Sequence, residues 1–347
     1  MGVFSQIPGL PGYVSEKIAK HRPIAADGYL EFLPGGVTLD GSKTRDAGNP
    51  DYNATTDPLA MFRLRAGLLL GKVTSSGKYT NSFLGYTNGA LTSAGTTVTL
   101  ASANHGVEMV RRIGATGTFK LIGPPTASGT VRALTATYSA ISSTSVTITA
   151  LGVSDVWTLT APAGQDGGMY QLEVTTGKGT SDESVQVTAA LAANANTATV
   201  DAALEALSNV GASGVAAVYS DPTLTLTFAA NLGPVHVRVL ADTTNDGGVF
   251  EGGWAAVHTT TGVDGRFVTG SLIADTDGSD VPLTFVPDGW ERLLPTDSTD
   301  SYAPRVPVAG NVDMSQFLPY WPADASLKQY IRDKLNTFGK FVDTSKY

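Results

Sequence analysis

Short runs of alternating apolar and polar residues, separated by glycine, proline and aspartate, dominate this chain. Clear examples are VWTLTA, TLTLTFA and PVHVRVLA, which begin at Val156, Thr223 and Pro234. An alternation with a period of two is typical of half-buried strands. The sequence therefore predicts a mainly β fold.

The composition agrees with many strands and turns. Charged residues make up 16% of the chain, against about 25% in a typical soluble domain. The 39 glycines and 18 prolines show no G-X-Y period, so they indicate turns and not a collagen-like fibre. The chain has no cysteine, which excludes disulfides, thiolate metal sites and cysteine nucleophiles.

The charge is unevenly distributed. Residues 1–125 hold 12 Lys+Arg and 8 Asp+Glu, residues 126–265 hold 3 and 12, and residues 266–347 hold 8 and 11. The net charge of −8 argues against nucleic acid as a partner, because phosphate binding needs a basic face. The sequence has neither an apolar run of signal-peptide length nor one of membrane-span length, so we expect a soluble protein made in the cytoplasm, with no membrane partner.

Four segments differ in pattern. We expect an extended N-terminal arm over residues 1–60, a β-rich core over 61–153, an inserted α+β module over 154–265, and a return to the core with a C-terminal amphipathic helix over 266–347. The arm is rich in Pro, Gly, Asp and Asn, and its apolar residues are isolated, so it cannot bury a core of its own. A short helix over 14–20 is the one element expected in its first half.

The core begins with a predicted strand over Met61–Val73. Later strands are expected within 78–87, 96–100, 117–122, 130–138 and 145–151. They are interrupted by one helix over 104–112, with Asn104 as its N-cap and Gly114 as its stop.

The module is predicted to combine one helix with a sheet. In the helix, expected over 197–209, Val200, Ala203, Leu204 and Leu207 follow helical spacing. The three alternating runs that follow it, over 214–220, 223–229 and 234–241, are expected to pair into one sheet with the helix across its face.

The last segment contains a predicted hairpin and a predicted helix. The strands FVTGSLIA and VPLTFVP flank a turn at Asp277-Gly278. Asp324 is the expected N-cap of a helix over Ala325–Phe338.

Motifs for catalysis are missing from the sequence. None of the four histidines stands at a zinc-site spacing, and His236 falls within an alternating run, where a sheet position is the simpler interpretation. There is no GxSxG elbow, no P-loop and no strand-linked GxGxxG. We therefore expect no catalytic residue, no cofactor and no enzymatic activity.

One loop offers a weak candidate for a metal site. Asp275, Asp277 and Asp280 bring three carboxylates together, as a hard cation prefers, but their spacing is not that of an EF-hand. A hairpin turn explains the same residues, and it is the preferred interpretation.

Several residues are candidates for contact with a partner surface. Arg63 and Arg65 are expected on one face of the first core strand, with a solvent-exposed strand face as the alternative. Trp290, Tyr320 and Trp321 lie beside prolines or turn residues, where aromatic side chains often anchor interfaces, although core packing explains them equally well. The full set of contact candidates is Phe4, Ile7, Leu10, Tyr13, Arg63, Arg65, Tyr320 and Trp321.

Two stretches carry a resemblance to a known family. DGYLEFLPGGVTLDGSKTRDAGNPDY, followed by LRAGLLLGKVTSSGKYTNSFLGYT, resembles phage head decoration proteins of the lambda-like kind. The matching elements are an extended arm, an R-x-G-x-x-L-G-K strand (Arg65, Gly67, Leu70, Gly71, Lys72) and a Ser-Gly-Lys-Tyr turn (Ser76 to Tyr79). The closing segment VPVAGNVDMSQFLPYWPADASLKQYIRDKL is similar to the C-terminal part of such proteins.

The resemblance covers roughly the first 150 and the last 80 residues. It implies a virion protein on the outer surface of the capsid, with the major capsid protein as its partner and a trimer as its form. The module departs from the small members of that family and looks like β-rich repeats of large bacterial surface proteins, which implies a projection from the capsid.

We therefore expect a capsid cement protein, which stabilises an expanded shell by binding across its subunit seams. The alternative is a carbohydrate-binding or adhesive surface module, whose partner is a host-surface glycan bound through residues 154–265. A glycosidase with paired carboxylates is the least favoured function, since no two acidic residues stand out from the turns.

Overall fold

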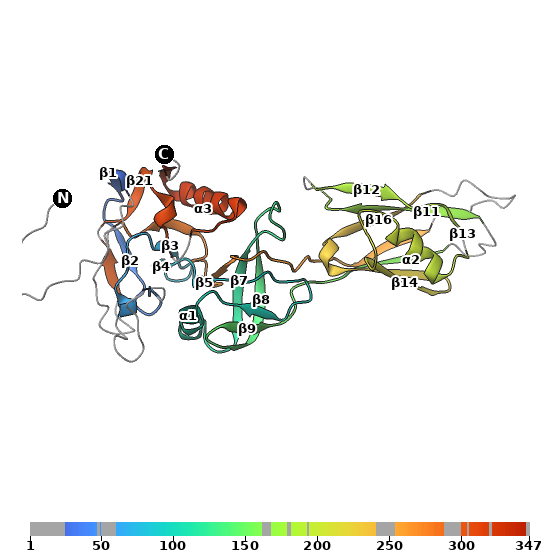
Figure 1. The fold of residues 1–347 in the computed structure, drawn as a ribbon, viewed down its shortest axis with the longest axis horizontal. Coiled ribbons are helices and arrows are strands. Elements are labelled where there is room, and N and C mark those ends of the chain that lie inside the picture. Colours follow the sequence, from blue (N-terminus) through green and yellow to red (C-terminus); the bar gives the residue numbers. More distant parts are fainter. Residues whose placement is uncertain are drawn as a thin grey trace, which may run out of the picture.

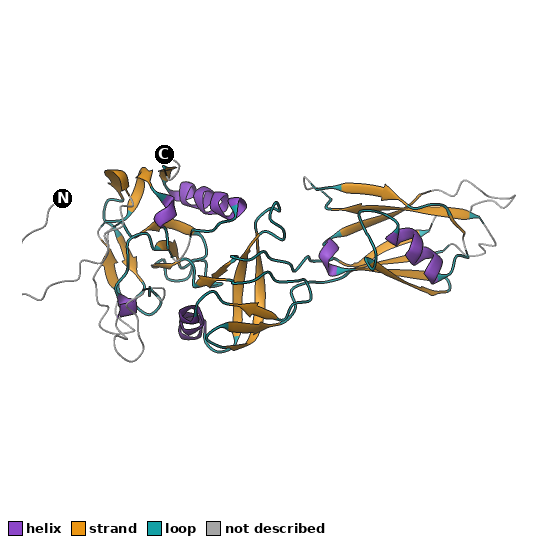
Figure 2. Ribbon diagram, viewed as in Figure 1, coloured by secondary structure: helices purple, strands orange, loops and turns teal. Residues whose placement is uncertain are grey.

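The computed structural model describes residues 25–46, 49, 60–161, 168–178, 182–192, 194–240, 254–287, 300–303, 305–318 and 321–344 of the 347-residue chain. The fold is mainly β, as Figure 2 shows, with 42% of the described residues in strands and 16% in helices. The sequence prediction of a mainly β fold is confirmed. The expected helix over 14–20 lies outside the described residues.

Separate hydrophobic cores divide the described chain into three bodies that lie in a row (Figure 1). The end body contains the cores around Phe285 and Leu70. The middle body is built on the core around Phe119, and the distal body on the core around Leu226. The buried residues of the distal core all fall between Trp157 and Trp254, whereas the other cores combine residues from both sides of that segment.

Two sheets form the end body. A three-stranded sheet has the order β1-β21-β22, and a five-stranded sheet has the order β19-β3-β4-β2-β20. Their strands are β1 (Ala25–Phe32), β21 (Pro307–Val312), β22 (Lys340–Asp343), β19 (Pro282–Phe285), β3 (Leu69–Lys72), β4 (Tyr79–Asn81), β2 (Val37–Leu39) and β20 (Ser301–Ala303). Segments from the two ends of the chain thus pair directly: β1 runs antiparallel to β21, and β2 runs antiparallel to β20.

The C-terminal helix α3 (Ala325–Phe338) covers part of the end body. The carboxylate of Asp324 accepts a hydrogen bond from Leu327 N at 3.0 Å, which satisfies one of the free N–H groups of the first turn. Leu327, Ile331 and Leu335 are fully buried against the core that contains Phe285. The predicted cap and helix bounds are confirmed here.

The predicted strand over Met61–Val73 is wrong in its first half. Residues Ala60–Phe62 form a short 3-10 helix (η1), and only β3 continues as a strand. Gly67 has a φ of +87°, a conformation that ends regular strand geometry and that side chains rarely adopt. The alternation expected for Arg63 and Arg65 therefore does not exist.

The middle body is a six-stranded sheet with one helix. The strand order is β5-β18-β7-β8-β9-β6, formed by β5 (Gly85–Tyr86), β18 (Leu272–Ala274), β7 (Gly117–Gly123), β8 (Arg132–Ile141), β9 (Ser145–Ile148) and β6 (Thr97–Thr99). The helix α1 (Ala103–Ile113) confirms the predicted helix, but its N-cap is Ser102 and not Asn104. Gly106 lies so close to the loop between β8 and β9 that a Cβ would stand 2.3 Å from the carbonyl oxygen of Ser142.

The distal body is a sandwich of two sheets. One sheet has the order β14-β15-β10-β17; in the other, β11 pairs with β12, β13 and β16. The strands are β10 (Asp155–Thr160), β11 (Met169–Thr176), β12 (Ser184–Val187), β13 (Leu191–Ala192), β14 (Val215–Ser220), β15 (Thr223–Phe228), β16 (Val235–Leu240) and β17 (Ala255–Thr260).

The expectation that three alternating runs form one sheet is wrong. β14 and β15 pair with each other, but β16 pairs with β11 in the opposite sheet. The short 3-10 helix η2 (Ala230–Leu232) and Gly233, which has a φ of +67°, turn the chain from one sheet to the other. Alternation identifies the buried face of a strand, but it does not identify the neighbouring strand.

The helix of the distal body, α2, spans Thr197–Glu205 and is shorter than predicted. It buries Val200 and Leu204, and it packs against β14 of one sheet and β13 of the other. The helix therefore bridges one open side of the sandwich, where the expectation placed it across a sheet face.

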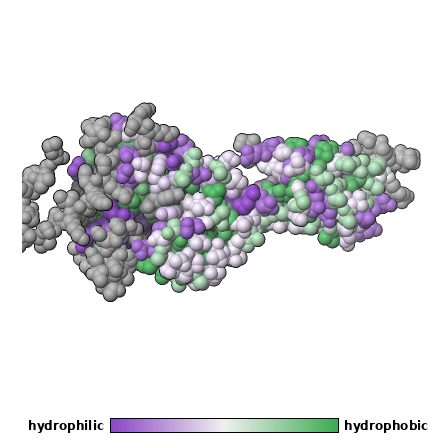
Figure 3. Space-filling model, viewed as in Figure 1, coloured by the Kyte–Doolittle hydropathy of each residue, from purple (hydrophilic) through white to green (hydrophobic). Residues whose placement is uncertain are grey.

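Two segments connect the middle and distal bodies, and they lie side by side. Val153 and Val263 form an isolated antiparallel bridge. Next to it, Asp264 accepts hydrogen bonds from Arg266 and lies 3.5 Å from Arg132. Figure 3 shows a hydrophilic patch where the two bodies meet. The distal body is thus attached through one narrow, polar junction.

Candidate functional site

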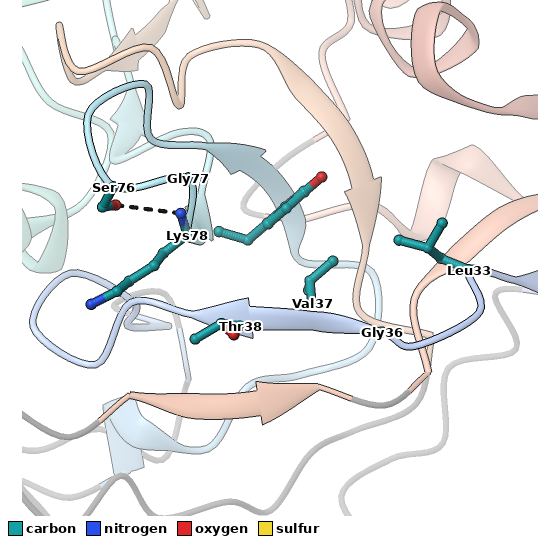
Figure 4. A pocket seen from close by; sticks show the side chains of 8 residues that line it. Leu33, Gly36, Val37, Thr38, Ser76, Gly77 and Lys78 are labelled. Atoms are coloured by element: carbon teal, nitrogen blue, oxygen red, sulfur yellow. Dashed lines mark hydrogen bonds between the residues drawn. The ribbon is translucent and has the colours of Figure 1, made fainter.

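The end body has a shallow depression. Its volume is about 440 Å³. One wall comes from β2 and the turn before it, and the other from the turn that leads into β4 (Figure 4). The lining residues are Leu33, Gly36, Val37, Thr38, Ser76, Gly77, Lys78 and Tyr79.

The second wall is the Ser-Gly-Lys-Tyr turn that contributed to the resemblance. Gly77 has a φ of +70°, which suits glycine in a tight turn. Its N–H donates to the carbonyl of Val73 at 2.9 Å, and Lys78 N donates to Ser76 Oγ at 3.3 Å. The turn thereby fixes the backbone from which the Lys78 side chain extends.

Lys78 brings a positive charge to the rim of the depression. Its Nζ lies 2.6 Å from Asp300 Oδ2, and both side chains are more than a third exposed. The hydrogen bond to Asp300 raises the pKa of Lys78, and the same bond lowers the pKa of Asp300. Lys78 therefore stays charged and remains open to solvent.

The chemistry of the depression favours binding over catalysis. The residues that line it supply two hydroxyls in Thr38 and Ser76, one paired ammonium in Lys78 and one phenol in Tyr79. Burial raises the pKa of Tyr79, so the phenol keeps its proton at neutral pH. None of these residues forms the nucleophile-and-base pair that covalent catalysis requires.

A network of buried ion pairs lies where the end and middle bodies meet. Arg112 at the end of α1 is fully buried, and it donates to Asp275 at 3.1 Å, to Ser279 Oγ at 2.6 Å and to the carbonyl of Asn81 at 2.8 Å. Lys43 Nζ lies 2.5 Å from Asp277 Oδ2. The network joins the loop after β2, helix α1 and the loop between β18 and β19.

The carboxylate of Asp277 in this loop is ionised. Burial alone would raise the pKa of Asp277, but hydrogen bonds from Lys43 and Ser279 and the charge of Arg112 hold it well below its usual value. Asp280 pairs with Lys120 at 2.8 Å. Each acidic side chain of the loop is therefore matched by a cation of the protein itself.

This arrangement contradicts both interpretations of the Asp-rich loop, the metal site and the hairpin turn. Asp275, Asp277 and Asp280 bind arginine and lysine, and the described residues contain no group of three or more His, Cys, Asp or Glu side chains placed to hold a metal ion. The loop is not a hairpin turn either, because β18 and β19 belong to different sheets. The sequence could not show this, since the partner Arg112 stands 163 positions from Asp275.

The two arginine candidates have different surroundings. Arg65 forms a two-pronged ion pair with Asp46, at 2.6 and 2.8 Å, and Asp46 is almost fully buried. Arg63 is half-buried. The guanidinium of Arg65 therefore holds Asp46 in place, and its Nε and Nη2 donors are used within the chain.

The aromatic candidates are only partly described. Trp321 is half-buried against Phe317, with ring centroids 6.0 Å apart, and Arg332 lies over its ring. Core packing therefore accounts for Trp321. The candidates Phe4, Ile7, Leu10, Tyr13 and Tyr320, and also Trp290, lie outside the described residues.

A second polar cluster, in the distal body, was missed by the sequence analysis. Asp155 is fully buried, and its carboxylate accepts hydrogen bonds from Val235 N at 3.1 Å and from Gly262 N at 2.8 Å. His258 Nε2 lies 3.1 Å from both of its oxygens, and the His258 ring stacks on Trp157 at 4.5 Å. The one sequence signal was an acidic residue at the start of an alternating run, where a buried strand leaves no room for an unpaired charge.

His236 lies in β16, so the prediction of a sheet position is confirmed. Its ring packs edge-on against Trp157, with centroids 5.4 Å apart. Burial lowers the pKa of His236. Since Asp155 and the two histidines are arranged around a tryptophan and not around a nucleophilic side chain, this cluster serves to hold the strands together.

In the described part of the chain, no helix is both long and apolar enough to cross a membrane. Comparisons with protein-family models, with curated proteins and with solved structures found no match to this chain.

Proposed function

We propose that this chain is a structural protein of a phage head, which binds the outer surface of the capsid across subunit seams and stabilises the expanded shell. One observation carries the proposal. The two segments that resemble decoration proteins are separated by more than a hundred residues in sequence, yet they pack into common sheets and cores, as in the pairing of β2 with β20. The segment between them folds around its own core.

In this proposal the end and middle bodies form the decoration core, and the distal body is an inserted module that projects from the shell. The arm expected over residues 1–60 belongs to this core from Ala25 on, since β1 pairs with β21 and β2 pairs with β20. The partner is the major capsid protein. A trimer at threefold positions would let each copy use the same patch of its surface.

The depression lined by Val37 and Lys78 supports a binding role for the end body. It combines apolar side chains with one exposed cation, and residues 1–125 carry an excess of four positive charges. A groove of this kind accommodates an acidic, extended segment of a partner protein. Such binding stabilises the assembled shell by mass action and needs no chemistry.

The direct test uses the full chain and phage heads that lack their own decoration protein. The protein is mixed with expanded and with unexpanded heads, sedimented, and the bound fraction is measured; negative-stain images then locate it. We expect saturable binding to expanded heads and a higher disruption temperature. Absence of binding to expanded heads, together with activity on a soluble substrate, would overturn the proposal.

Two charge-reversal variants distinguish binding of heads by the end body from binding by the distal body. Lys78→Glu places a negative charge at the depression, and Lys178→Glu makes the same change at an exposed position of the distal body. We expect Lys78→Glu to lower the affinity for heads about tenfold or more, because the variant repels an acidic partner segment that the wild type attracts. Lys178→Glu should leave the affinity unchanged.

The alternative function is glycan binding by the distal body. Tyr219, which is 38% exposed at the end of β14, is the observation that favours it, because exposed aromatic rings can stack on sugars. The two tryptophans of this body, Trp157 and Trp254, are buried and unavailable for such stacking. A glycan array probed with the wild type and with Tyr219→Ser tests this function independently of head binding.

A further inference from the structure

Strand β17 forms an open edge of the distal body. Within the described residues it pairs with β10 alone, so one row of its N–H and C=O groups faces away from the sheet. Five of its six residues are exposed, and Val257 retains 57% of its accessible surface. Its sequence, AAVHTT, contains neither an acidic nor a lysine or arginine side chain.

Two other edge strands of the sandwich, β14 and β12, are capped by side chains. At β14, the carboxylate of Asp201 in α2 accepts the N–H of Ala217 at 2.6 Å. At β12, the amide of Asn209 donates to the carbonyl of Ser184 at 3.0 Å. These contacts occupy backbone groups that another strand would need.

The first residue of β16 is blocked as well. Val235 donates its N–H to Asp155, and its carbonyl accepts from Trp157 Nε1 at 2.9 Å. Exposed edge strands are normally protected by charges, prolines or caps, because an unprotected edge pairs with other strands. Among the six-residue strands at the edges of this sandwich, β17 has neither a charge nor a side-chain cap in the described part of the chain.

The acidic charge of the distal body limits which of its surfaces two copies can bring together. Residues 154–265 contain 2 Lys+Arg and 12 Asp+Glu. Two such bodies repel each other over most of their surfaces. The uncharged edge at β17 is a place where two copies can approach without bringing acidic side chains together.

We infer that β17 is a self-association edge, at which the same strand of a second copy of this chain pairs antiparallel about a twofold axis. A register centred on Val257 sets Val257 opposite its own copy and Ala255 opposite Thr259. These three residues share the outer face of the sheet, since Thr259 Oγ1 lies 3.2 Å from Thr158 Oγ1 and Val257 pairs with Thr158. Residues opposite each other in an antiparallel pair must share a face, so this register is allowed.

Pairing of two six-residue edges buries a small area, which predicts a weak dimer in free solution. The strand pair forms more readily where copies of the chain are held close together. Once two copies are attached to one assembly, the pairing of their β17 strands becomes an intramolecular contact. Screening of the acidic surfaces should strengthen the pair as salt is added.

The absence of cysteine from the chain permits a direct test by cross-linking. In the proposed register the two Val257 Cα atoms lie about 4.5–5.5 Å apart, within the range of about 4.4–6.8 Å that a disulfide spans. We expect the full chain with Val257→Cys to form a covalent dimer under mild oxidation. The control is Val218→Cys on β14, which is 60% exposed but lies on the opposite edge of the sheet.

Sedimentation of the full chain over a range of concentrations gives the second readout. We expect Val257→Lys to weaken self-association at least tenfold, and Val218→Lys to leave it unchanged. The inference is overturned if the Val257→Cys and Val218→Cys variants cross-link equally, or if the wild type does not self-associate through this edge at millimolar concentration in high salt. Since neither readout involves phage heads, failure here is distinct from failure of the proposed function.

Discussion

The imidazole of His258 and the carboxylate of Asp155 lie 3.1 Å apart, although 103 positions separate them in the chain. The same carboxylate accepts the N–H groups of Val235 and Gly262. One buried acidic side chain therefore connects β10, β17, the start of β16 and the segment that leaves the distal body.

We predict that Asp155→Ala destabilises the distal body. The substitution leaves two buried N–H donors without an acceptor, at a cost of about 3 kcal/mol in the free energy of unfolding. Urea unfolding followed by the fluorescence of the buried tryptophans measures this loss. Asn194→Ala, at an exposed position of the same body, should change the stability by less than about 0.5 kcal/mol. Equal effects of the two variants would contradict the role assigned to Asp155.

We predict that Arg112→Met loosens the contact between the end and middle bodies. Arg112 is fully buried, and its loss leaves Asp275 buried without its hydrogen-bonded cation. Removing one partner of a buried ion pair costs about 3–5 kcal/mol. Chemical denaturation gives the magnitude, and Arg238→Met, at an exposed position of β16, is the matched control. If the two variants unfold alike, the network does not stabilise the junction.

The sequence was sufficient where burial follows a local pattern. Leu224, Leu226 and Phe228 are buried in alternation with threonines, and helix α3 begins and ends at the residues that its cap and periodicity indicated. Pairing was less predictable, because β16 joins β11 through long-range contacts that no local pattern encodes. The partners of the candidate site residues were unpredictable for the same reason.

The Asp-rich loop illustrates that limit. Three acidic residues close together in sequence suggest a cation or a turn, and only the fold brings Arg112, Lys43 and Lys120 to them. Asp155 shows the converse, since an acidic residue that looked ordinary in sequence is fully buried in the structure. A lone charge in a sequence does not reveal its partner.

We predict that stability falls between pH 6.5 and pH 4 because of His105. Burial lowers the pKa of this histidine to about 4, against the opposing effect of a hydrogen bond to the Tyr86 backbone. As the pH decreases, the unfolded chain therefore binds the proton first, so the contribution of His105 is complete above pH 6.5 and is lost towards pH 4. The loss amounts to about 3 kcal/mol.

The measurement is the free energy of unfolding at several pH values for the wild type and for His105→Gln. The variant should show a shallower decrease over this range. His236→Gln serves as the comparison, because His236 is less buried and its loss should change the slope less than the loss of His105 does. An unchanged slope in His105→Gln would show that another group governs the acid sensitivity.

We predict that Gly71→Ala disrupts the end body. A Cβ at this position would stand 2.0 Å from the carbonyl oxygen of Ser279 and 2.7 Å from that of Val281. Both contacts are with backbone, so relief requires β3 and the neighbouring Asp-rich loop to separate. Overpacking of this kind costs about 1–3 kcal/mol or more, and here it also strains the ion pairs of Asp275 and Asp277.

The matched control is Gly89→Ala, because a Cβ there meets no atom within 4 Å. Thermal unfolding of the two variants compares them directly: Gly71→Ala should unfold at a clearly lower temperature, or fail to accumulate as folded protein, while Gly89→Ala should behave like the wild type. A wild-type unfolding temperature for Gly71→Ala would mean that the loop over residues 275–280 is free to move away from β3, and that the ion-pair network does not fix the end body to the middle body.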